Sequence, residues 1–246
     1  MDEPVLIERR ADRVIATLHR PDKRNAIDLA MVEALHDVCT ELEDRPRILI
    51  LTGAGGVFAA GADIAQLRAR RADDARKNIN AALFIRVHEL PMPVIAALDG
   101  YALGGGAELA YAADIRIATP SLRIGNPEVG LGILAAAGAT WRLPALVGEA
   151  LAAEMLYTGR ALTADEALAA GLITGIHAAD ALMDAAHAIA DRIGTNDPLA
   201  IRHTKTALRA PRAEHPRIDS ELQAELFESP EKMRRMTEFL AQRGRP

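Results

Sequence analysis

The sequence contains a single cysteine, Cys39, among 246 residues. One cysteine excludes an intramolecular disulfide and a metal site built from several thiolates, and it is typical of a reducing compartment such as the cytoplasm. The seven histidines are scattered and form no metal-binding motif such as HExxH. We therefore expect neither a disulfide framework nor a metal centre.

Long apolar runs and an excess of basic charge are also missing. No stretch of about 18 uninterrupted apolar residues suggests a membrane span, and residues 1–21 lack the basic and apolar regions of a signal peptide. The formal net charge of -5 argues against general affinity for nucleic acids or anionic membranes, because both require a basic surface. The sequence predicts a soluble, unprocessed, cytoplasmic protein that binds neither nucleic acid nor membrane.

Apolar residues make up 50% of the chain, which is ample for a large core. Short β-prone runs at 5–8 and 14–18 predict an N-terminal hairpin. Asp28 is a suitable N-cap for a helix over 29–42. The residues expected to face the core from this helix recur at helical spacing: Leu29, Val32, Leu35, Cys39 and Leu42.

Near-continuous apolar runs at 47–52, 93–98 and 114–118 predict strands that are buried on both faces and largely parallel. Because helical segments separate them, the expected fold class is α/β. The linker-like stretch 195–198 predicts an α/β core over 1–195 and a helical segment over 196–246. In the second half of the chain, helices are expected at 150–156, 163–170 and 182–193, with two more after Asp197.

Two glycine-containing turns follow the first two buried strands. They read AAGAD at 59–63 and LGGGAE at 103–108. Backbone N–H groups at such strand-to-helix turns lack helical partners and can point together at a developing negative charge, as in an oxyanion hole. The alternative for each turn alone is close packing of a helix on the sheet. Neither turn has the lysine ending of a P-loop or the spacing of a dinucleotide fingerprint, which disfavours a nucleotide-binding enzyme.

Two glutamates, Glu108 and Glu128, accompany these turns. Taken singly, each is explained as an acid at the start of a helix, where it complements the helix dipole. If both approached one water in an apolar pocket, repulsion and desolvation would separate their pKa values. The pair would then supply one acid and one base near neutral pH.

The stretch PVIAALDGYALGGGAELAYAADIRIA, with FAAGADI before it and IGNPEVGLGI after it, resembles the crotonase, or enoyl-CoA hydratase/isomerase, family. The resemblance continues through Trp141-Arg142-Leu143, Gly148, YTGRALTADEALAAGLI and PLAIRHTK, so it covers nearly the whole chain from HRPDKRNAI onward. It implies a crotonase-like α/β fold, in which a ββα spiral core is followed by a helical C-terminal segment.

The resemblance also implies roles for individual residues. The amides of Ala62 and Gly105 would hold the thioester oxygen of an acyl-CoA. The Glu108 position orients and activates water, and the Glu128 position delivers and recovers the proton at the α-carbon. Retention of both carboxylates implies hydration of a trans-2-enoyl-CoA to the 3-hydroxyacyl-CoA. No metal or redox cofactor is implied, because coenzyme A is part of the substrate.

Further substrate contacts are implied around these groups. Asp63 is also expected to bond amides of its own turn, and Arg24, Arg68 or the pair Arg70-Arg71 could meet phosphates of coenzyme A. For any one of these arginines a solvated helix face is the alternative. The implied substrate-binding set is Arg24, Ala26, Ala60, Asp63, Ile64, Gly104, Ala136 and Trp141.

The sequence departs from the hydratase pattern in several places. Residues 135–139 read AAAGA where hydratases commonly have a proline-glycine-alanine-glycine-glycine stretch, and Ala136 replaces a glycine whose amide helps hold the water. Trp141 replaces a commonly polar residue, Ala65 a lysine, and Arg234-Arg235 a Glu-Gly pair. An isomerase or another CoA lyase therefore stays open, as does a catalytically weak acyl-CoA-binding protein.

The family resemblance extends to assembly. Its members usually form trimers or dimers of trimers, with C-terminal helices covering a neighbour's CoA site, so we expect a homotrimer or hexamer in which 196–246 serves oligomerisation. One branch of the family binds RNA, but this chain lacks the lysine-rich helix that such binding requires. The length and branching of the acyl chain are not predicted.

Overall fold

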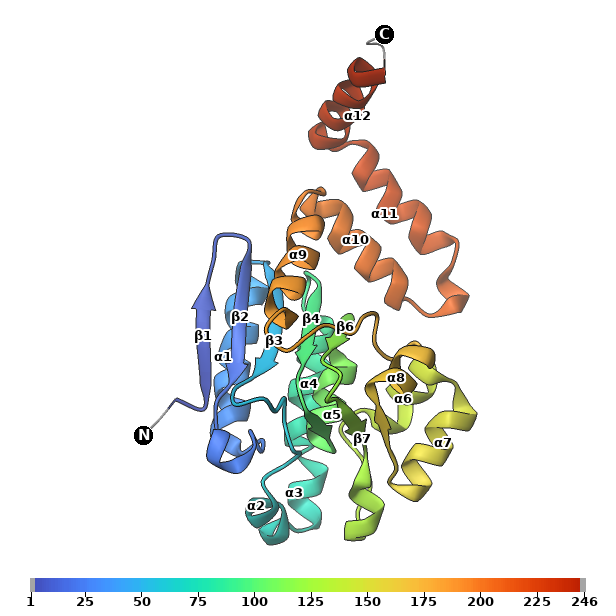
Figure 1. Cartoon of the computed structure of the whole chain (residues 1–246). Coiled ribbons are helices and arrows are strands. Elements are labelled where there is room, and N and C mark those ends of the chain that lie inside the picture. The colour runs from blue at the N-terminus through green and yellow to red at the C-terminus, as the bar shows by residue number, and fades with distance from the viewer. Residues whose placement is uncertain (1–2, 244–246) are drawn as a thin grey trace. The chain divides into compact units, whose positions relative to one another are not determined.

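The buried apolar runs form a five-stranded sheet of order β1-β2-β3-β4-β6 in the computed structural model, which describes residues 3–243 (Figure 1). β1 pairs antiparallel with β2, and the other pairs are parallel. The predicted hairpin and the three predicted strands are confirmed. The strands span Val5–Arg9 (β1), Arg13–Leu18 (β2), Ile48–Gly53 (β3), Val94–Leu98 (β4) and Ile115–Ala118 (β6).

A second sheet is small and was not predicted. It has the order β5-β7-β8, with β5 parallel to β7 and β7 antiparallel to β8. Each strand has three residues, which is too short for a periodic apolar pattern to mark it. The strands span Tyr101–Leu103 (β5), Arg123–Gly125 (β7) and Ala161–Thr163 (β8).

The helix expected after Asp28 is α1, Leu29–Asp44, and the Asp28 side chain accepts a hydrogen bond from the Met31 amide. The expected core position of Leu29 is wrong, because this residue is 44% exposed while Met31 is fully buried. Leu29 is the first helical residue and lies just outside the buried face. That face carries Met31, Val32, Leu35, Val38, Cys39 and Leu42.

Two further helices contribute to the hydrophobic core beside the large sheet: α4, Ile79–Glu89, and α5, Gly105–Ala112. α1 contacts β1 and β2, and α4 contacts both α1 and α5, so the three helices line up beside the sheet (Figure 1). Cys39 lies inside this core, and burial raises the pKa of its thiol to about 12. It is therefore a packed apolar residue, as its position in the helical stripe predicts.

The remaining helices before residue 195 lie between the strands or follow β8. Within the described residues, Pro21–Lys23 and Pro127–Leu131 form short 3-10 turns, η1 and η2. The α-helices are α2 (Ile64–Ala69), α3 (Ala72–Arg76), α6 (Ala139–Val147), α7 (Glu149–Thr158), α8 (Ala164–Ala169) and α9 (Leu182–Gly194). The helices expected at 150–156, 163–170 and 182–193 correspond to α7, α8 and α9, whereas α6 was not predicted.

The chain divides into two compact units, Met1–Ala190 and Asp191–Pro246. Three α-helices follow Asp197 in the described part of the second unit, not the two predicted: α10 (Pro198–Arg209), α11 (Arg217–Phe227) and α12 (Pro230–Arg243). The additional break falls at Ser229-Pro230, because proline lacks the N–H that a helix interior needs and here begins a new helix. No helix within residues 3–243 is long and apolar enough to cross a membrane. The domain boundary at 195 stays a prediction.

Candidate active site

The two glycine-containing turns lie side by side because the first turn runs along β5. The Ala59 amide donates to the Tyr101 carbonyl at 3.0 Å, and the Leu103 amide donates to the Ala59 carbonyl at 3.0 Å. The first turn then leads through Ala62 into α2, while β5 leads through Gly104 into α5. Residues about 40 positions apart in the chain are thereby held next to one another.

The three consecutive glycines serve three different purposes. Gly104 is the N-cap of α5 and has φ 53° and ψ -125°, a backbone conformation that residues with a Cβ atom rarely adopt. A Cβ on Gly106 would lie 2.4 Å from the Ala59 carbonyl oxygen, so this glycine permits close packing. A Cβ on Gly105 would lie 3.6 Å from the Ala62 nitrogen, an ordinary contact distance. Gly105 therefore keeps open the space beside two backbone amides.

Both of these amides are available to a ligand. Gly105 is the first residue of α5, so its N–H has no acceptor within its own helix. The Ala62 N–H donates no hydrogen bond to another residue of the range 3–243. Two unpaired N–H groups beside one open space have the arrangement of an oxyanion hole.

Glu108 lies on the first turn of α5 and is only 3% exposed. Its Oε1 accepts hydrogen bonds from the amides of Ala137, at 2.7 Å, and Ala139, at 3.1 Å. Burial raises the pKa of Glu108 to about 7, and the charge of Glu128 adds to the rise, while the two amides and Arg142 oppose it. The raised pKa allows this carboxyl to exchange a proton near neutral pH.

Glu128 lies in η2, three residues after the end of β7, and is 8% exposed. Its Oε1 lies 3.0 Å from the position of a Cβ on Gly104, and its buried Oε2 has no hydrogen-bond partner among the described residues. Burial raises the pKa of Glu128, against the lowering effects of its own backbone and of Asn126. A buried carboxylate oxygen without a protein partner is costly, so it marks a position where a ligand is expected.

The loop that carries Glu128 is tied to the glycine turn through Asn126. The buried Tyr111 hydroxyl donates to Asn126 Oδ1 at 3.0 Å, and Asn126 Nδ2 donates to the Gly104 carbonyl at 3.4 Å. Tyr111 belongs to α5, the helix that also carries Glu108. One buried network therefore positions both carboxylates relative to the same turn.

A pocket of about 590 Å³ contains these groups. Its wall is mostly apolar, with Ile64, Leu67, Ile79, Ile133 and Leu134 among its residues. This volume lies within the range of small-molecule sites. Eight of the residues expected at the site line it: Ala60, Ala62, Ile64, Gly104, Gly105, Glu108, Glu128 and Ala136.

Residues 10–244 match the family described as Enoyl-CoA hydratase/isomerase. The chain belongs to this family. It is 37% identical to the short-chain-enoyl-CoA hydratase of Clostridium acetobutylicum, over 97% of this chain and 95% of that protein. It is 38% identical to the crotonyl-CoA hydratase of Syntrophomonas wolfei, over 83% of this chain and 81% of that protein.

Solved structures of this family confirm the expected fold. The enoyl-CoA hydratase from Bacillus anthracis superimposes with a TM-score of 0.92 at 32% identity, covering 97% of this chain and 96% of that one. The enoyl-CoA hydratase from Thermoplasma volcanium gives 0.89 at 35% identity, covering 96% and 97%. The crotonase-like α/β fold with a helical C-terminal part is therefore established for this chain.

Three of the expected substrate-binding residues support the first turn instead of lining the pocket. The Arg24 carbonyl accepts from the Ala60 amide at 3.0 Å, and the Ala26 carbonyl accepts from Arg20 Nη1 at 2.6 Å. Asp63 caps α2 by accepting from the amides of Ala65 and Gln66. The substrate-binding roles of Arg24, Ala26 and Asp63 stay predictions.

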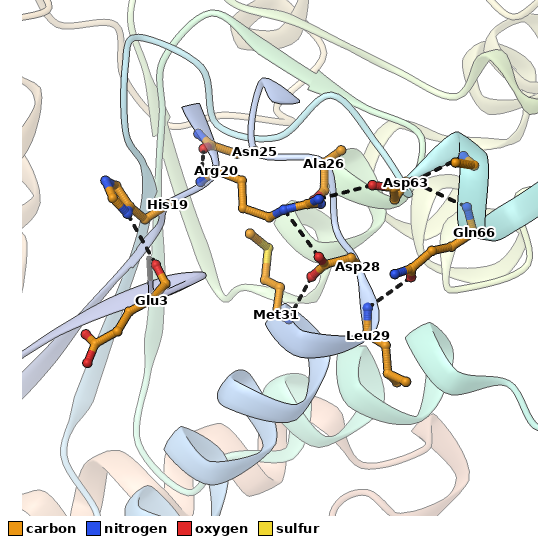
Figure 2. Close-up of polar contacts among 11 residues, drawn as sticks. Glu3, His19, Arg20, Asn25, Ala26, Asp28, Leu29, Met31, Asp63 and Gln66 are labelled. Atoms are coloured by element: carbon orange, nitrogen blue, oxygen red, sulfur yellow. Dashed lines mark hydrogen bonds and ion pairs between the residues drawn. The ribbon is translucent and has the colours of Figure 1, made fainter. Parts of the chain in front are cut away.

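Arg20 was missed in the sequence, although it holds this region together. Figure 2 shows its guanidinium between Asp28 and Asp63, with 3.2 Å between the paired nitrogen and oxygen atoms on each side. Asp28 caps α1 and Asp63 caps α2, so Arg20 links the starts of two helices just beside Ala62. A single arginine in a polar turn has no distinguishing sequence signal.

Trp141 lies in α6 outside the pocket lining and is 48% exposed, with the Arg142 guanidinium carbon 5.6 Å from its ring centroid. Its substrate-binding role also stays a prediction. Arg70 and Arg71 line the pocket, whereas Arg68 is outside the lining. Asn80 lines it as well and was missed, because a lone asparagine near the start of a helix carries no sequence signal.

Proposed function

We propose that this protein is an enoyl-CoA hydratase, which adds water across the 2,3 double bond of a trans-2-enoyl-CoA to give a 3-hydroxyacyl-CoA. The observation that carries the proposal is the convergence of two buried carboxyls, Glu108 and Glu128, on a pocket that also holds two unpaired backbone amides. Membership of the enoyl-CoA hydratase/isomerase family supports it, as do the relatives named as hydratases.

The amides of Ala62 and Gly105 would bind the thioester carbonyl oxygen. When a nucleophile attacks C3, negative charge moves onto this oxygen and the acyl group becomes an enolate. Fixed N–H donors lower the energy of that charge more than the energy of the neutral substrate, so they accelerate the reaction. A side chain on Gly105 would occupy the space beside these donors, so glycine leaves that space open to the thioester oxygen.

The two carboxyls would handle the protons. Glu108 accepts a proton from water as the water oxygen forms its bond to C3, and Glu128 gives a proton to C2 as the enolate collapses. The elements of water are thereby added, and one proton is relayed through the pair. Such a pair must hold one proton at the start, and burial favours this because it raises both pKa values and disfavours double ionisation.

The reaction proposed here uses no metal or redox cofactor. Charge on the oxygen is balanced by backbone dipoles, proton transfer is assigned to carboxyl groups, and no electrons are exchanged with an acceptor. Coenzyme A enters as part of the substrate. Arg70 and Arg71, both at the pocket wall, are candidates for contact with its phosphates.

We further propose a cytoplasmic homotrimer or dimer of trimers, in which the C-terminal helices contribute to the subunit contacts. Large apolar side chains that are exposed in the single chain support this assembly, because such residues are usually covered in oligomers. In the second unit they include Leu208, Phe227, Met233, Met236 and Leu240. The mass in solution tests the proposal, and a monomer would contradict it.

The hydratase proposal is tested by incubating the protein with crotonyl-CoA and longer 2-enoyl-CoAs and following loss of the conjugated thioester absorbance. We expect hydration that Glu108→Gln and Glu128→Gln each lower by about 1,000-fold or more, whereas the control Glu33→Gln, at an exposed position of α1, retains it. No hydration at any chain length would contradict the proposal. Conversion of a 3-enoyl-CoA would then indicate an isomerase, and binding of a thioester without turnover would indicate a binding protein.

A further inference from the structure

Asn80, the second residue of α4, is a polar residue at the pocket wall that the proposed mechanism does not use. Its Oδ1 is buried, and neither end of its side-chain amide hydrogen-bonds another residue of the range 3–243. A buried amide oxygen without a partner costs free energy that the fold does not recover, and the amide nitrogen beside it keeps its hydrogens for a group outside the protein. The side chain is therefore uncommitted within the protein and available to a ligand.

Asn80 also lies beside the oxyanion hole. Its Nδ2 is 3.6 Å from the position of a Cβ on Gly105, and the Ala62 nitrogen is 3.6 Å from the same point. The nitrogen of Gly105 itself is about 2.5 Å from that point by standard backbone geometry. Three nitrogen atoms that carry hydrogen thus surround one space.

A structural role does not explain this asparagine. The N-cap of α4 is Asn78, not Asn80, and asparagine is a poor residue for the body of a helix because its amide competes with the backbone. An apolar side chain at this position would match Ile64, Leu67 and Ile79 in the wall. The amide group is thus unfavourable for the helix and for the empty pocket alike.

We propose that Asn80 is a third hydrogen-bond donor to the thioester oxygen, beside the amides of Ala62 and Gly105. The inference rests on the proposed function of the pocket. Because the charge on this oxygen is largest in the enolate, the Asn80 amide stabilises the enolate more than the bound substrate. It differs from the two backbone donors in that a substitution can remove it without altering the main chain.

The first experiment measures kcat and KM for crotonyl-CoA hydration by Asn80→Ala and Asn80→Asp. We expect Asn80→Ala to lower kcat about tenfold with little change in KM, since the lost interaction acts mainly in the transition state. Asn80→Asp keeps the size but places an acceptor beside the developing anion, so a larger loss of about 100-fold is expected. The control Asn196→Ala, whose amide contacts Arg192 in the second unit, leaves kcat unchanged.

The second experiment needs no turnover. Affinities are measured for butyryl-CoA, a saturated thioester, and for acetoacetyl-CoA, which binds such a hole as its enolate. Asn80→Ala is expected to weaken acetoacetyl-CoA about tenfold more than butyryl-CoA and to reduce the enolate absorbance of the bound ligand. A residue that only shaped the wall would weaken both ligands alike.

The outcomes separate the two proposals. One outcome is that the wild-type protein hydrates crotonyl-CoA and that both Asn80 variants have the same kcat and the same ratio of acetoacetyl-CoA to butyryl-CoA affinity as the wild type. The role of Asn80 is then disproved, and the hydratase proposal stands. If the wild type shows no hydration, the hydratase proposal fails and the affinity ratio still decides whether Asn80 faces the anion. Thermal unfolding of each variant verifies that it is folded.

Discussion

Arg116 and Glu128 are both charged side chains buried in the first unit, and they differ in what satisfies them. Arg116, 5% exposed, donates from Nε to the Leu172 carbonyl at 2.7 Å and from Nη1 to the Ala113 carbonyl at 2.6 Å. Glu128, 8% exposed, has one oxygen with no partner in the described chain. The fold supplies carbonyl acceptors to Arg116 and leaves one oxygen of Glu128 to a ligand. For these two residues, carbonyl acceptors supplied by the fold indicate a structural role, and a pocket-facing oxygen without a partner indicates a functional one.

The strongest test of this contrast is removal of the carboxyl chemistry. Glu128→Gln and Glu108→Gln each keep the size of the side chain but cannot exchange a proton. We expect hydration to fall by about 1,000-fold or more, which is the scale of general acid–base catalysis. The free energy of unfolding should not decrease, because burial opposes ionisation at both sites. Steady-state kinetics and urea unfolding measure the two quantities. A large loss of stability would mean that these carboxyls are structural.

Arg116→Met is the reciprocal substitution. It leaves the carbonyls of Leu172 and Ala113 buried without a donor, so we expect the free energy of unfolding to fall by about 4 kcal/mol. The kcat of the folded variant should stay close to wild type, because Arg116 does not line the pocket. The control Arg217→Met, at an exposed position of α11, should leave stability unchanged. If Arg116→Met lowered kcat without lowering stability, Arg116 would have a catalytic role and would not differ from Glu128 in function.

Adjacent glycines allow the same contrast to be tested within one turn. Gly105→Ala meets only ordinary contacts, so we expect a folded protein whose kcat falls about 100- to 1,000-fold because a methyl group enters the oxyanion hole. Gly106→Ala places a Cβ 2.4 Å from the Ala59 carbonyl, so its main effect should be on stability. Kinetics and thermal unfolding of both variants check this. Equal losses of stability would contradict the assignment of Gly105 to the oxyanion hole.

The smallest effect expected is on the pH dependence of stability. The pKa of Glu108 is raised in the folded state from 4.5 to about 7, so the fold favours the protonated form. The contribution of Glu108 to stability therefore falls as the pH rises from 4.5 to 7.

Glu108→Gln lacks this titration and can still accept from the amides of Ala137 and Ala139. It should gain up to about 3 kcal/mol relative to wild type over this interval. Urea unfolding across the pH range measures the difference. A constant difference between the two proteins would show that Glu108 titrates normally.

The elements that could be predicted from the sequence are those whose cause is local. The runs at 47–52, 93–98 and 114–118 are nearly continuous in apolar residues because both faces of a parallel sheet are buried, and Asp28 is an N-cap by its own side-chain chemistry. Leu29 was placed in the core wrongly because periodicity does not show where the buried face begins. The three-residue strands β5, β7 and β8 depend on partners that no local pattern identifies.

Some residues of the candidate site could be predicted from the sequence, and others only the structure shows. The family resemblance pointed to Ala62, Gly105, Glu108 and Glu128, and the structure brings all four to one pocket. It also shows that residues 135–139, where the sequence departs from the hydratase pattern, provide two amides that bond Glu108. Neither Arg20 nor Asn80 could be recognised beforehand, because their importance depends on neighbours distant in the chain.

The sequence by itself determined the α/β class, the buried parallel strands, the capped helix after Asp28 and the family. Each follows from side-chain polarity, from spacing, or from motifs that occur in a particular order. Only the tertiary structure decided which buried polar atoms lack partners, because hydrogen-bond satisfaction depends on groups that folding brings together. Gly105 illustrates the difference: the sequence shows that it has no side chain, and the structure shows that the space beside it is surrounded by N–H groups.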